Sequence, residues 1–224
     1  MNVDEAIRKR RAVRNYTDAP VPEDVLDSVL RLALAAPTGS GAQAWSLLVI
    51  RDAEKRRALA DLVIAGAGRY FATMRPRKEG TSDEEHAAWG RDYANEILAS
   101  YHHVPVWVLG LIVPRRPYPA GMEEGGHTDD LLSVAFATQN LMLAARSHGL
   151  GTCPTTAFWR FELETLRDLL EIPEEVEPVV LTPVGYPTAF PKGRPPALRN
   201  FRPWQTLVHD DAFGSVRESP ETAD

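Results

Sequence analysis

One long segment, residues 129–148, carries apolar side chains on nearly every side of the helix that its spacing predicts. It reads DDLLSVAFATQNLMLAARSH, and Gly149 and Gly151 follow as typical helix-ending residues. A helix that is apolar all round is buried in a protein core or in an interface between subunits. This requirement constrains the fold strongly, because the protein must supply a covering surface on several sides of one helix.

Three apolar runs predict strands, over residues 45–52, 104–114 and 177–187. The segments between the strands have helical spacing, whereas residues 66–94 are polar and are expected to form an irregular excursion from the core. Few strands with helices between them indicate an α+β fold around a small sheet. We expect one domain over residues 1–210 and a solvated tail over 211–224. The predicted helices cover residues 3–13, 22–36, 53–66, 93–102, 129–148 and 161–173.

Charge and cysteine content exclude several classes of protein. The formal net charge of −6 argues against general binding to nucleic acid or to an anionic membrane. Cys153 is the single cysteine, so no internal disulfide can form, which is typical of a reducing compartment. The first residues lack the apolar region of a signal peptide, and no apolar run reaches membrane-spanning length. We therefore expect a cytoplasmic protein.

Familiar catalytic motifs are absent from the sequence. No histidine, cysteine or acidic spacing indicates a metal site, and no GxSxG motif indicates a serine nucleophile. Cys153 precedes Pro154, and a buried structural role is favoured for it over a nucleophilic one. The GSG at 39–41 follows a predicted helix rather than a strand, so it does not predict a dinucleotide-binding turn.

Basic residues gather in two clusters, RKRRAVR at 8–14 and FPKGRPPALRNFR at 190–202. Arg10 and Arg14 are four residues apart, so on a helix or its last turn they share a face. The planar fork of arginine matches the oxygens of a phosphate group, and several such forks make a site for a dianion. A solvated basic face and a nucleic-acid patch are the alternative interpretations of each cluster.

Two segments of small residues could accommodate a flat ligand. One is AAPTGSGAQAW at 35–45, between a predicted helix and strand, and the other is GLGTCPTTAF at 149–158. Thin side chains let a planar molecule lie against the backbone and its N–H groups. Ordinary connecting loops remain the alternative for both.

With these motifs in this order, the sequence resembles the nitroreductase family of FMN-dependent oxidoreductases over about residues 5–205. RRAVRNY resembles the Arg-x-Ser-x-Arg opening of the family, and APTGSGAQAW resembles its serine-rich loop ending in Gln-Pro-Trp. NEILASYHHVPVWVLGLI is similar to its middle helix and strand, and QNLMLAARSHGLGTCPTTAF to its core helix and turn. VGYPTAFPKGRP is similar to its closing strand and basic tail.

The resemblance implies a small, mostly antiparallel sheet flanked by helices, in an intertwined homodimer with exchanged terminal arms and an FMN between the subunits. It places Arg10 at the FMN phosphate and Arg14 towards the ribityl chain and the pyrimidine edge. Lys192 and Arg194 would complete the phosphate site. The other implied FMN-binding positions are Arg11 and Ala12 in the opening motif, Pro37, Thr38, Gly39 and Gln43 beside the isoalloxazine, Asn95 at its polar edge, and Thr156 and Ala157 near N5.

Some residues depart from the family pattern. Ala12 stands where the family has serine, and Ala44 stands where it has proline. Gly41 and Ala42 replace a common pair that contains asparagine. Leu98 occupies the place of a lysine that several members keep near flavin N1 and O2. Because reduced flavin is anionic, Arg14 or a backbone donor would have to replace that charge.

The resemblance implies an enzyme in which the flavin takes a hydride from NADH or NADPH and then reduces a nitroaromatic, quinone or enone by a ping-pong scheme. No catalytic side chain is required of the protein, and we assign none. Trp89, Tyr93 and Tyr70 are candidates for a lid, although surface or core roles are favoured for them. The alternatives are a flavin-fragmenting or dehalogenating enzyme, a protein that stores or senses FMN, and a nucleic-acid-binding module.

Overall fold

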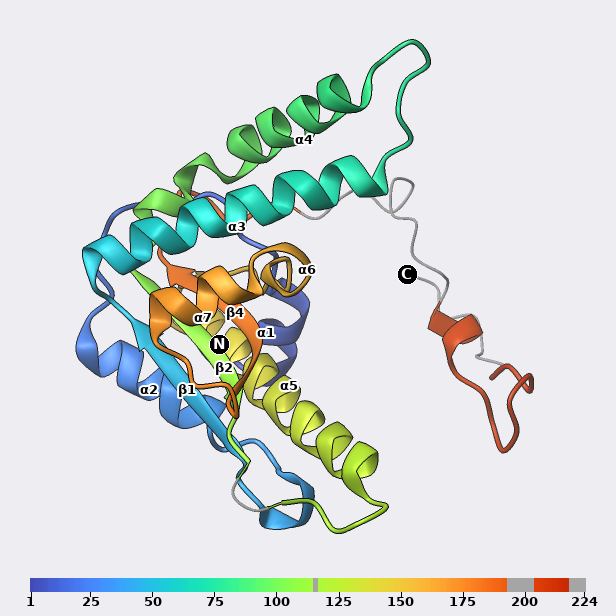
Figure 1. The fold of residues 1–224 in the computed structure, drawn as a ribbon. Helices are drawn as coiled ribbons and strands as arrows, with labels where there is room; N and C mark the ends of the chain where they lie inside the picture. Colours follow the sequence, from blue (N-terminus) through green and yellow to red (C-terminus); the bar gives the residue numbers. More distant parts are fainter. Residues whose placement is uncertain (115–116, 193–203, 218–224) are drawn as a thin grey trace, which may run out of the picture. The chain divides into compact units, whose positions relative to one another are not determined.

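The structure is a computed structural model that describes residues 1–114, 117–192 and 204–217 (Figure 1). The chain divides into two compact units, Met1–Pro191 and Lys192–Asp224, and each is described by itself. In the second unit, a short helix η4 (Trp204–Leu207) precedes a turn in which Arg217 and Asp210 form an ion pair at 2.8 Å. The domain boundary predicted at residue 210 stays a prediction.

The first unit is built on a four-stranded antiparallel sheet with the strand order β1-β2-β4-β3. The strands are β1 (Trp45–Ile50), β2 (Val106–Ile112), β3 (Gly151–Thr152) and β4 (Glu177–Gly185). All seven residues of β2 are buried, as the continuous apolar run predicts for a central strand. The α+β class and the three longer strands are confirmed, whereas β3, with two residues, was not predicted.

Alternate residues of β2 belong to two different layers of the core. Val106 and Val108 pack with α2 (Glu23–Ala33) and α5 (Glu123–Ser147). Trp107 and Leu109 pack on the other side, with residues of α3 (Ala53–Met74), α4 (Asp83–Leu98) and α7 (Leu163–Leu170). Because successive strand side chains point to opposite faces, one strand supports both helical layers. Figure 1 shows α3 and α4 together on one side of the sheet.

The prediction of an irregular segment at 66–94 is wrong. The structure has α3 continuing to Met74 and α4 starting at Asp83, so most of the segment is a helical hairpin that extends beyond the sheet (Figure 1). A Cβ atom on Gly90 would lie 2.4 Å from the carbonyl oxygen of Gly68, which shows how closely the two helices approach. Glycine has low helix propensity, so the residues that permit this contact also obscure the helical pattern.

Helix α5 has two different faces in the single chain. It is 25 residues long and starts at Glu123, earlier than the predicted residue 129. Val134, Ala137 and Leu141 are buried against the sheet. On another face Leu132 and Phe136 are 46% and 47% exposed. The apolar side chains on all sides of α5 therefore form one face in the core and one face that the described residues leave exposed.

The remaining elements of the first unit are short. They are α1 (Val3–Lys9), η1 (Gly39–Gly41), η2 (Ala99–His103) and α6 (Phe158–Phe161). A search of the described helices for one with the length and apolarity needed to cross a membrane finds none.

Candidate functional site

The arginines of the N-terminal cluster do not share a helix face, which corrects the prediction for residues 3–13. Helix α1 ends at Lys9, and Arg10 already has extended backbone angles (φ −62°, ψ 134°). The chain then runs beside β3, where the Val13 N–H donates to the Thr152 carbonyl at 3.0 Å. Val13 is 1% exposed, whereas Arg14, the next residue, is exposed. Because successive side chains of an extended chain point to opposite sides, Arg14 lies on the other side of the chain from Val13.

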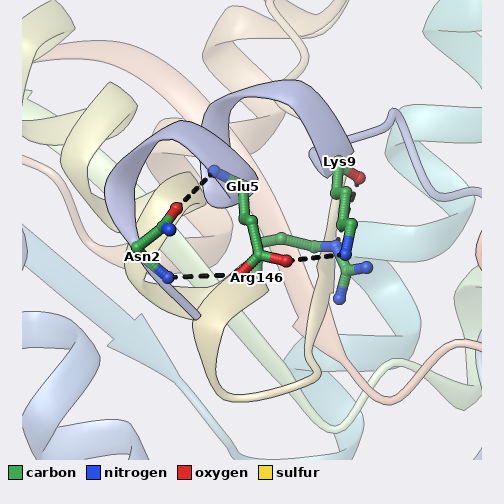
Figure 2. A network of polar contacts seen from close by, with 4 residues as sticks. All are labelled: Asn2, Glu5, Lys9 and Arg146. Carbon is green, nitrogen blue, oxygen red and sulfur yellow. Dashed lines mark hydrogen bonds and ion pairs between the residues drawn. The ribbon is translucent and has the colours of Figure 1, made fainter.

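A polar network fixes the helix that precedes these arginines (Figure 2). Asn2 and Glu5 form a capping box, in which the Glu5 N–H donates to Asn2 Oδ1 at 2.9 Å. Lys9 donates to Glu5 Oε1 at 3.0 Å, and this contact together with the Asn2 backbone lowers the pKa of Glu5. Arg146 of α5 donates to the Lys9 carbonyl at 3.2 Å (Figure 2). The network thus neutralises Lys9 and ties the end of α1 to α5.

The arginines of the cluster differ in the contacts that their side chains make. Arg11 donates from one nitrogen to the carbonyls of Arg8 and Arg10, at 2.6 and 2.8 Å, so it caps the end of α1. No side-chain ion pair within the described part of the chain involves Arg8, Arg10 or Arg14. The guanidinium groups of Arg10 and Arg14 therefore have no ion-pair partner among the described residues.

A cavity of about 350 Å³ lies where three parts of the chain meet. They are the extended residues 10–14, which we call the arginine segment, helix α3, and the turn at 153–157 after β3. Three of the sequence-predicted residues line it: Arg14, Thr156 and Ala157. Leu98 also lines it, in the place where the family pattern has a lysine. None of the described lining residues is acidic. Its remaining described walls are Val63, Ala67, Tyr70, Phe71, Tyr101, Cys153, Pro154, Thr155, Arg160 and Phe161.

Small residues let the turn at 153–157 approach α3. Thr155 pairs with Leu181 of β4 through two backbone hydrogen bonds of 2.8 and 3.1 Å. A Cβ atom on Gly66 would lie 3.3 Å from the Ala157 carbonyl oxygen, closer than most side chains allow. Arg69 of α3 also forms an ion pair with Glu162 at 3.2 Å. The sheet and α3 therefore hold the turn against the cavity from two sides.

Cys153 and Tyr101 form the floor of this cavity. Cys153 is 7% exposed, so the burial predicted from the sequence is confirmed, and its structural role stays a prediction. Burial raises the pKa of Tyr101 above its ordinary value, and its contact with Cys153 adds to the shift. Tyr101 is therefore a neutral phenol near neutral pH.

The loop at 37–43 is well ordered by local contacts. The Gly39 N–H donates to Ser133 Oγ of α5 at 3.2 Å, and a Cβ atom on Gly39 would lie 2.8 Å from Cβ of Asp129. Ser40 and Gln43 both have left-handed backbone angles, with φ of 50° and 49°. Such strain in residues other than glycine is concentrated at functional sites.

This loop lies at the opposite end of the sheet from the arginine segment. β1 begins at Trp45, which pairs with Ile112, whereas Thr152 pairs with Val184, which pairs in turn with Val106. The span from Val106 to Ile112 is about 20 Å at the usual rise of a strand. That distance exceeds the length of a three-ring aromatic system.

A second cavity, of about 610 Å³, adjoins the loop. Gly39, Tyr118 and Asp130 are among its described lining residues. Tyr118 donates to Asp130 Oδ2 at 2.6 Å. The pKa of Tyr118 is raised to about 12, first by burial and then by this bond to Asp130. Of the sequence-predicted residues, Gly39 lines this second cavity, whereas Arg14, Thr156 and Ala157 line the first.

Nine predicted positions line neither cavity or lie outside the described residues: Arg10, Arg11, Ala12, Pro37, Thr38, Gln43, Asn95, Lys192 and Arg194. Asn95 is exposed on α4, and its amide donates to the Arg91 carbonyl of the same helix at 3.0 Å. Lys192 begins the second unit, and Arg194 is not among the described residues. The predicted FMN contacts of all nine stay predictions.

Sequence reasoning missed Arg160 and Phe71 as cavity residues. Arg160 lies on α6, three residues after Ala157, and forms no ion pair within the described part of the chain. It brings a second cation to the cavity beside Arg14. The motif at 149–158 ends just before it, so extending the motif by one helical turn would have included it.

The contact between Gly151 and Val13 provides a test of how the arginine segment is positioned. A Cβ atom on Gly151 would lie 2.7–2.8 Å from all three side-chain carbons of Val13. We expect Gly151→Ala to lower the free energy of unfolding by about 1–3 kcal/mol, as overpacking does, and to weaken flavin binding. Urea unfolding and a flavin titration measure the two effects.

Gly125 supplies the matched control, because nothing lies within 4 Å of a Cβ atom built there. Gly125→Ala is expected to stabilise α5 by up to about 1 kcal/mol. Equal stability of the two alanine variants would contradict the close contact between β3 and the arginine segment.

Comparison with known proteins identifies the family. The profile described as "Nitroreductase family" matches residues 7–186. A "FMN reductase (NADPH)" of Bacillus subtilis is 28% identical over 223 residues, which cover 95% of this chain and 74% of the relative. A "4-nitrobenzoate reductase" of Nocardioides sp. is 30% identical over 205 residues, or 83% of this chain and 81% of the relative.

A solved structure shares the fold. Oxidized iodotyrosine deiodinase bound to FMN and 3-iodo-L-tyrosine aligns with a TM-score of 0.67 at 22% identity. The alignment covers 95% of this chain and all of the other. Since the profile spans most of the chain and the four-stranded sheet agrees with it, the chain belongs to the nitroreductase family.

Proposed function

We propose that this protein is an FMN-dependent oxidoreductase that takes electrons from NADH or NADPH and passes them to a small electron-poor acceptor. The observation that carries the proposal is the cavity of about 350 Å³ that joins Arg14 to the turn at Thr156 and Ala157. Family membership and the relatives described as FMN and nitrobenzoate reductases support the same activity.

The described residues of this cavity fit an FMN. Arg14 and Arg160 supply positive charge without a lining carboxylate, as an anionic cofactor requires. Val63, Ala67 and Phe71 provide apolar surface for a flat ring. FMN, when bound, supplies the hydride and electron chemistry.

The side chains of the cavity would bind and orient the ligands. The guanidinium groups of Arg14 and Arg160 would favour the anionic form of the reduced cofactor, a role that Leu98 cannot perform. Tyr101 would remain protonated, because burial raises its pKa. The chain would thus contribute electrostatics and shape, while Arg10 and the basic tail at Lys192 and Arg194 would hold the phosphate.

A second copy of the chain would complete the site. The loop at 37–43 lies at the other end of the sheet from Arg14, about 20 Å away along the strands. In a two-fold dimer with exchanged terminal arms, this loop would reach the cavity of the partner. The exposed apolar face of α5 at Leu132 and Phe136 supplies a surface for that contact.

Anaerobic titration with each nicotinamide tests the proposal. We expect the purified protein to be yellow, to lose its flavin absorbance with NADH or NADPH, and to regain it with a nitroaromatic or a quinone. A flavin that is bound but is not bleached by either donor would support storage or sensing instead and would contradict the enzyme assignment. A protein that binds no flavin would refute the proposal.

Dehalogenation is the second candidate, because the chain shares its fold with an iodotyrosine deiodinase. Addition of 3-iodotyrosine to the reduced protein separates the two activities. Release of iodide with return of the flavin colour would favour this candidate. Rapid reoxidation by 4-nitrobenzoate without iodide release is the result that the proposed reductase activity predicts.

A further inference from the structure

A third pocket, of about 310 Å³, lies at the tip of the α3–α4 hairpin, outside the site described above. Its described lining contains two cations, two aromatic rings and a hydroxyl group, and no carboxylate. The lining residues are Arg75, Pro76, Lys78, Thr81, His86 and Trp89.

Two of three stacked rings on α4, His86 and Trp89, line this tip pocket. His86, Trp89 and Tyr93 are successive neighbours on α4, with ring centroids 5.6 Å apart and planes within 15° and 14° of parallel. The Arg75 guanidinium lies 5.3 Å from the centroids of both Trp89 and Tyr93. His86 Nε2 donates to the Ala72 carbonyl at 2.7 Å, which fixes the ring against α3. The three rings therefore stack on one another, with Arg75 over two of them and His86 held against α3.

The two cations of the tip pocket have no counterion within the described part of the chain. Neither Arg75 nor Lys78 takes part in a described ion pair. Nearby acids are engaged elsewhere or lie outside the lining: Asp83 pairs with Arg77, and Glu85 closes the capping box with Ser82. Two like charges around one cavity repel each other, and a bound anion removes that repulsion.

Aromatic contacts connect the tip pocket to the candidate flavin cavity. Phe71 lines the cavity that contains Arg14, and its ring centroid is 5.2 Å from that of Tyr93. Tyr93 in turn is the neighbour of Trp89, which lines the tip pocket. A dinucleotide, in which two riboses and a diphosphate join two bases, is long enough to lie along this row of rings.

We propose that the tip pocket binds the adenosine phosphate half of the nicotinamide donor, while the nicotinamide enters the cavity beside Arg14. The aromatic rings of His86 and Trp89 suit contact with a base, and the cations Arg75 and Lys78 suit phosphate oxygens. This inference rests on the proposed function, since it extends the donor from that cavity along the hairpin. The pocket thereby gives the hairpin a role in binding the electron donor.

Steady-state kinetics of the flavin-loaded enzyme with Arg75→Gln tests the inference. A lost charged hydrogen bond is worth about 1.5–3 kcal/mol, so KM for NADPH should rise about tenfold or more. Reduced nicotinamide mononucleotide lacks the adenosine half, so the ratio of KM for NADPH to KM for this shorter donor should rise by the same factor. NADH in parallel shows which phosphate is bound, because a larger effect with NADPH indicates the 2′-phosphate.

Arg77→Gln is the matched control, because Arg77 lies in the same turn, pairs with Asp83 and does not line the pocket. It is expected to leave all three KM values unchanged. Equal effects of the two variants, or an equal effect of Arg75→Gln on both NADPH and the shorter donor, would overturn the inference.

Direct binding keeps the test independent of turnover. In calorimetry, adenosine 2′,5′-bisphosphate should bind the unsubstituted flavin-loaded protein, and Arg75→Gln should weaken that binding about tenfold or more. No detectable binding to the unsubstituted protein would also overturn the inference. If none of the three donors reduces the bound flavin, the proposed function is refuted. Calorimetry then still tests the tip pocket, because it does not depend on turnover.

Discussion

Arg14→Ala is expected to lower the affinity of the protein for FMN by about ten- to a hundredfold. Arg14 lines the candidate flavin cavity and forms no ion pair with another described residue, so its charge is available to the cofactor. One charged hydrogen bond contributes about 1.5–3 kcal/mol, which corresponds to that change in dissociation constant. Quenching of flavin fluorescence during a titration of the flavin-free protein measures it.

Arg8→Ala is the matched control for this change. Arg8 belongs to the same basic cluster but lies exposed on α1, and it does not line the cavity. Its removal should leave the dissociation constant within about twofold, because screened surface charges contribute little. Equal losses in both variants would indicate a diffuse attraction to the basic cluster, and no loss in Arg14→Ala would exclude the assigned contact.

Phe136→Asp is expected to separate the proposed dimer and to abolish flavin binding at micromolar protein concentration. Phe136 is 47% exposed on α5 beside Leu132, and a carboxylate there would have to be buried in the subunit contact. An unpaired buried charge costs several kcal/mol, so the dimer should weaken by a factor of about 100 or more. Sedimentation velocity gives the oligomeric state, and absorbance in the flavin bands gives the occupancy.

Phe136→Leu keeps an apolar side chain at the same position and should retain both the dimer and the flavin. Far-UV circular dichroism of Phe136→Asp should match that of the original protein, because the position is exposed in the single chain. A folded Phe136→Asp monomer that still holds FMN would contradict a cofactor site shared between subunits.

The sheet could be predicted from the sequence because its long strands are unusually apolar. The runs at 45–52, 104–114 and 177–187 each contain a strand of the structure, and β2 is buried throughout. A strand that is buried on both faces has no alternation of polar and apolar residues. The central strand was therefore predicted from its continuous apolar composition. The short strand β3 carries too few residues to show any period.

The helical hairpin could not be predicted from local propensity. Gly68 and Gly90 permit a backbone contact between α3 and α4, and the tertiary packing there outweighs the poor helix propensity of glycine. One local signal was present, since Ser82 and Glu85 form a capping box at the start of α4. The spacing of Arg10 and Arg14 predicted a shared helix face. That prediction is wrong, because the chain there is extended beside β3.

The candidate site was predictable in its residue types more than in its arrangement. Arg14, Thr156 and Ala157 meet in one cavity, as the resemblance implies. The loop that contains Gly39 and Gln43 lies at the far end of the sheet, next to Asp129. Motif order along a chain does not distinguish residues that meet within one subunit from residues that meet across two.

A crystal structure of the FMN-loaded protein tests the central claim most directly. The account predicts flavin density in the cavity of about 350 Å³, with Arg14 and Ala157 of one subunit on one side and the loop at 37–43 of a second copy on the other. Flavin density away from Arg14, or a flavin bound entirely by one subunit, would contradict it.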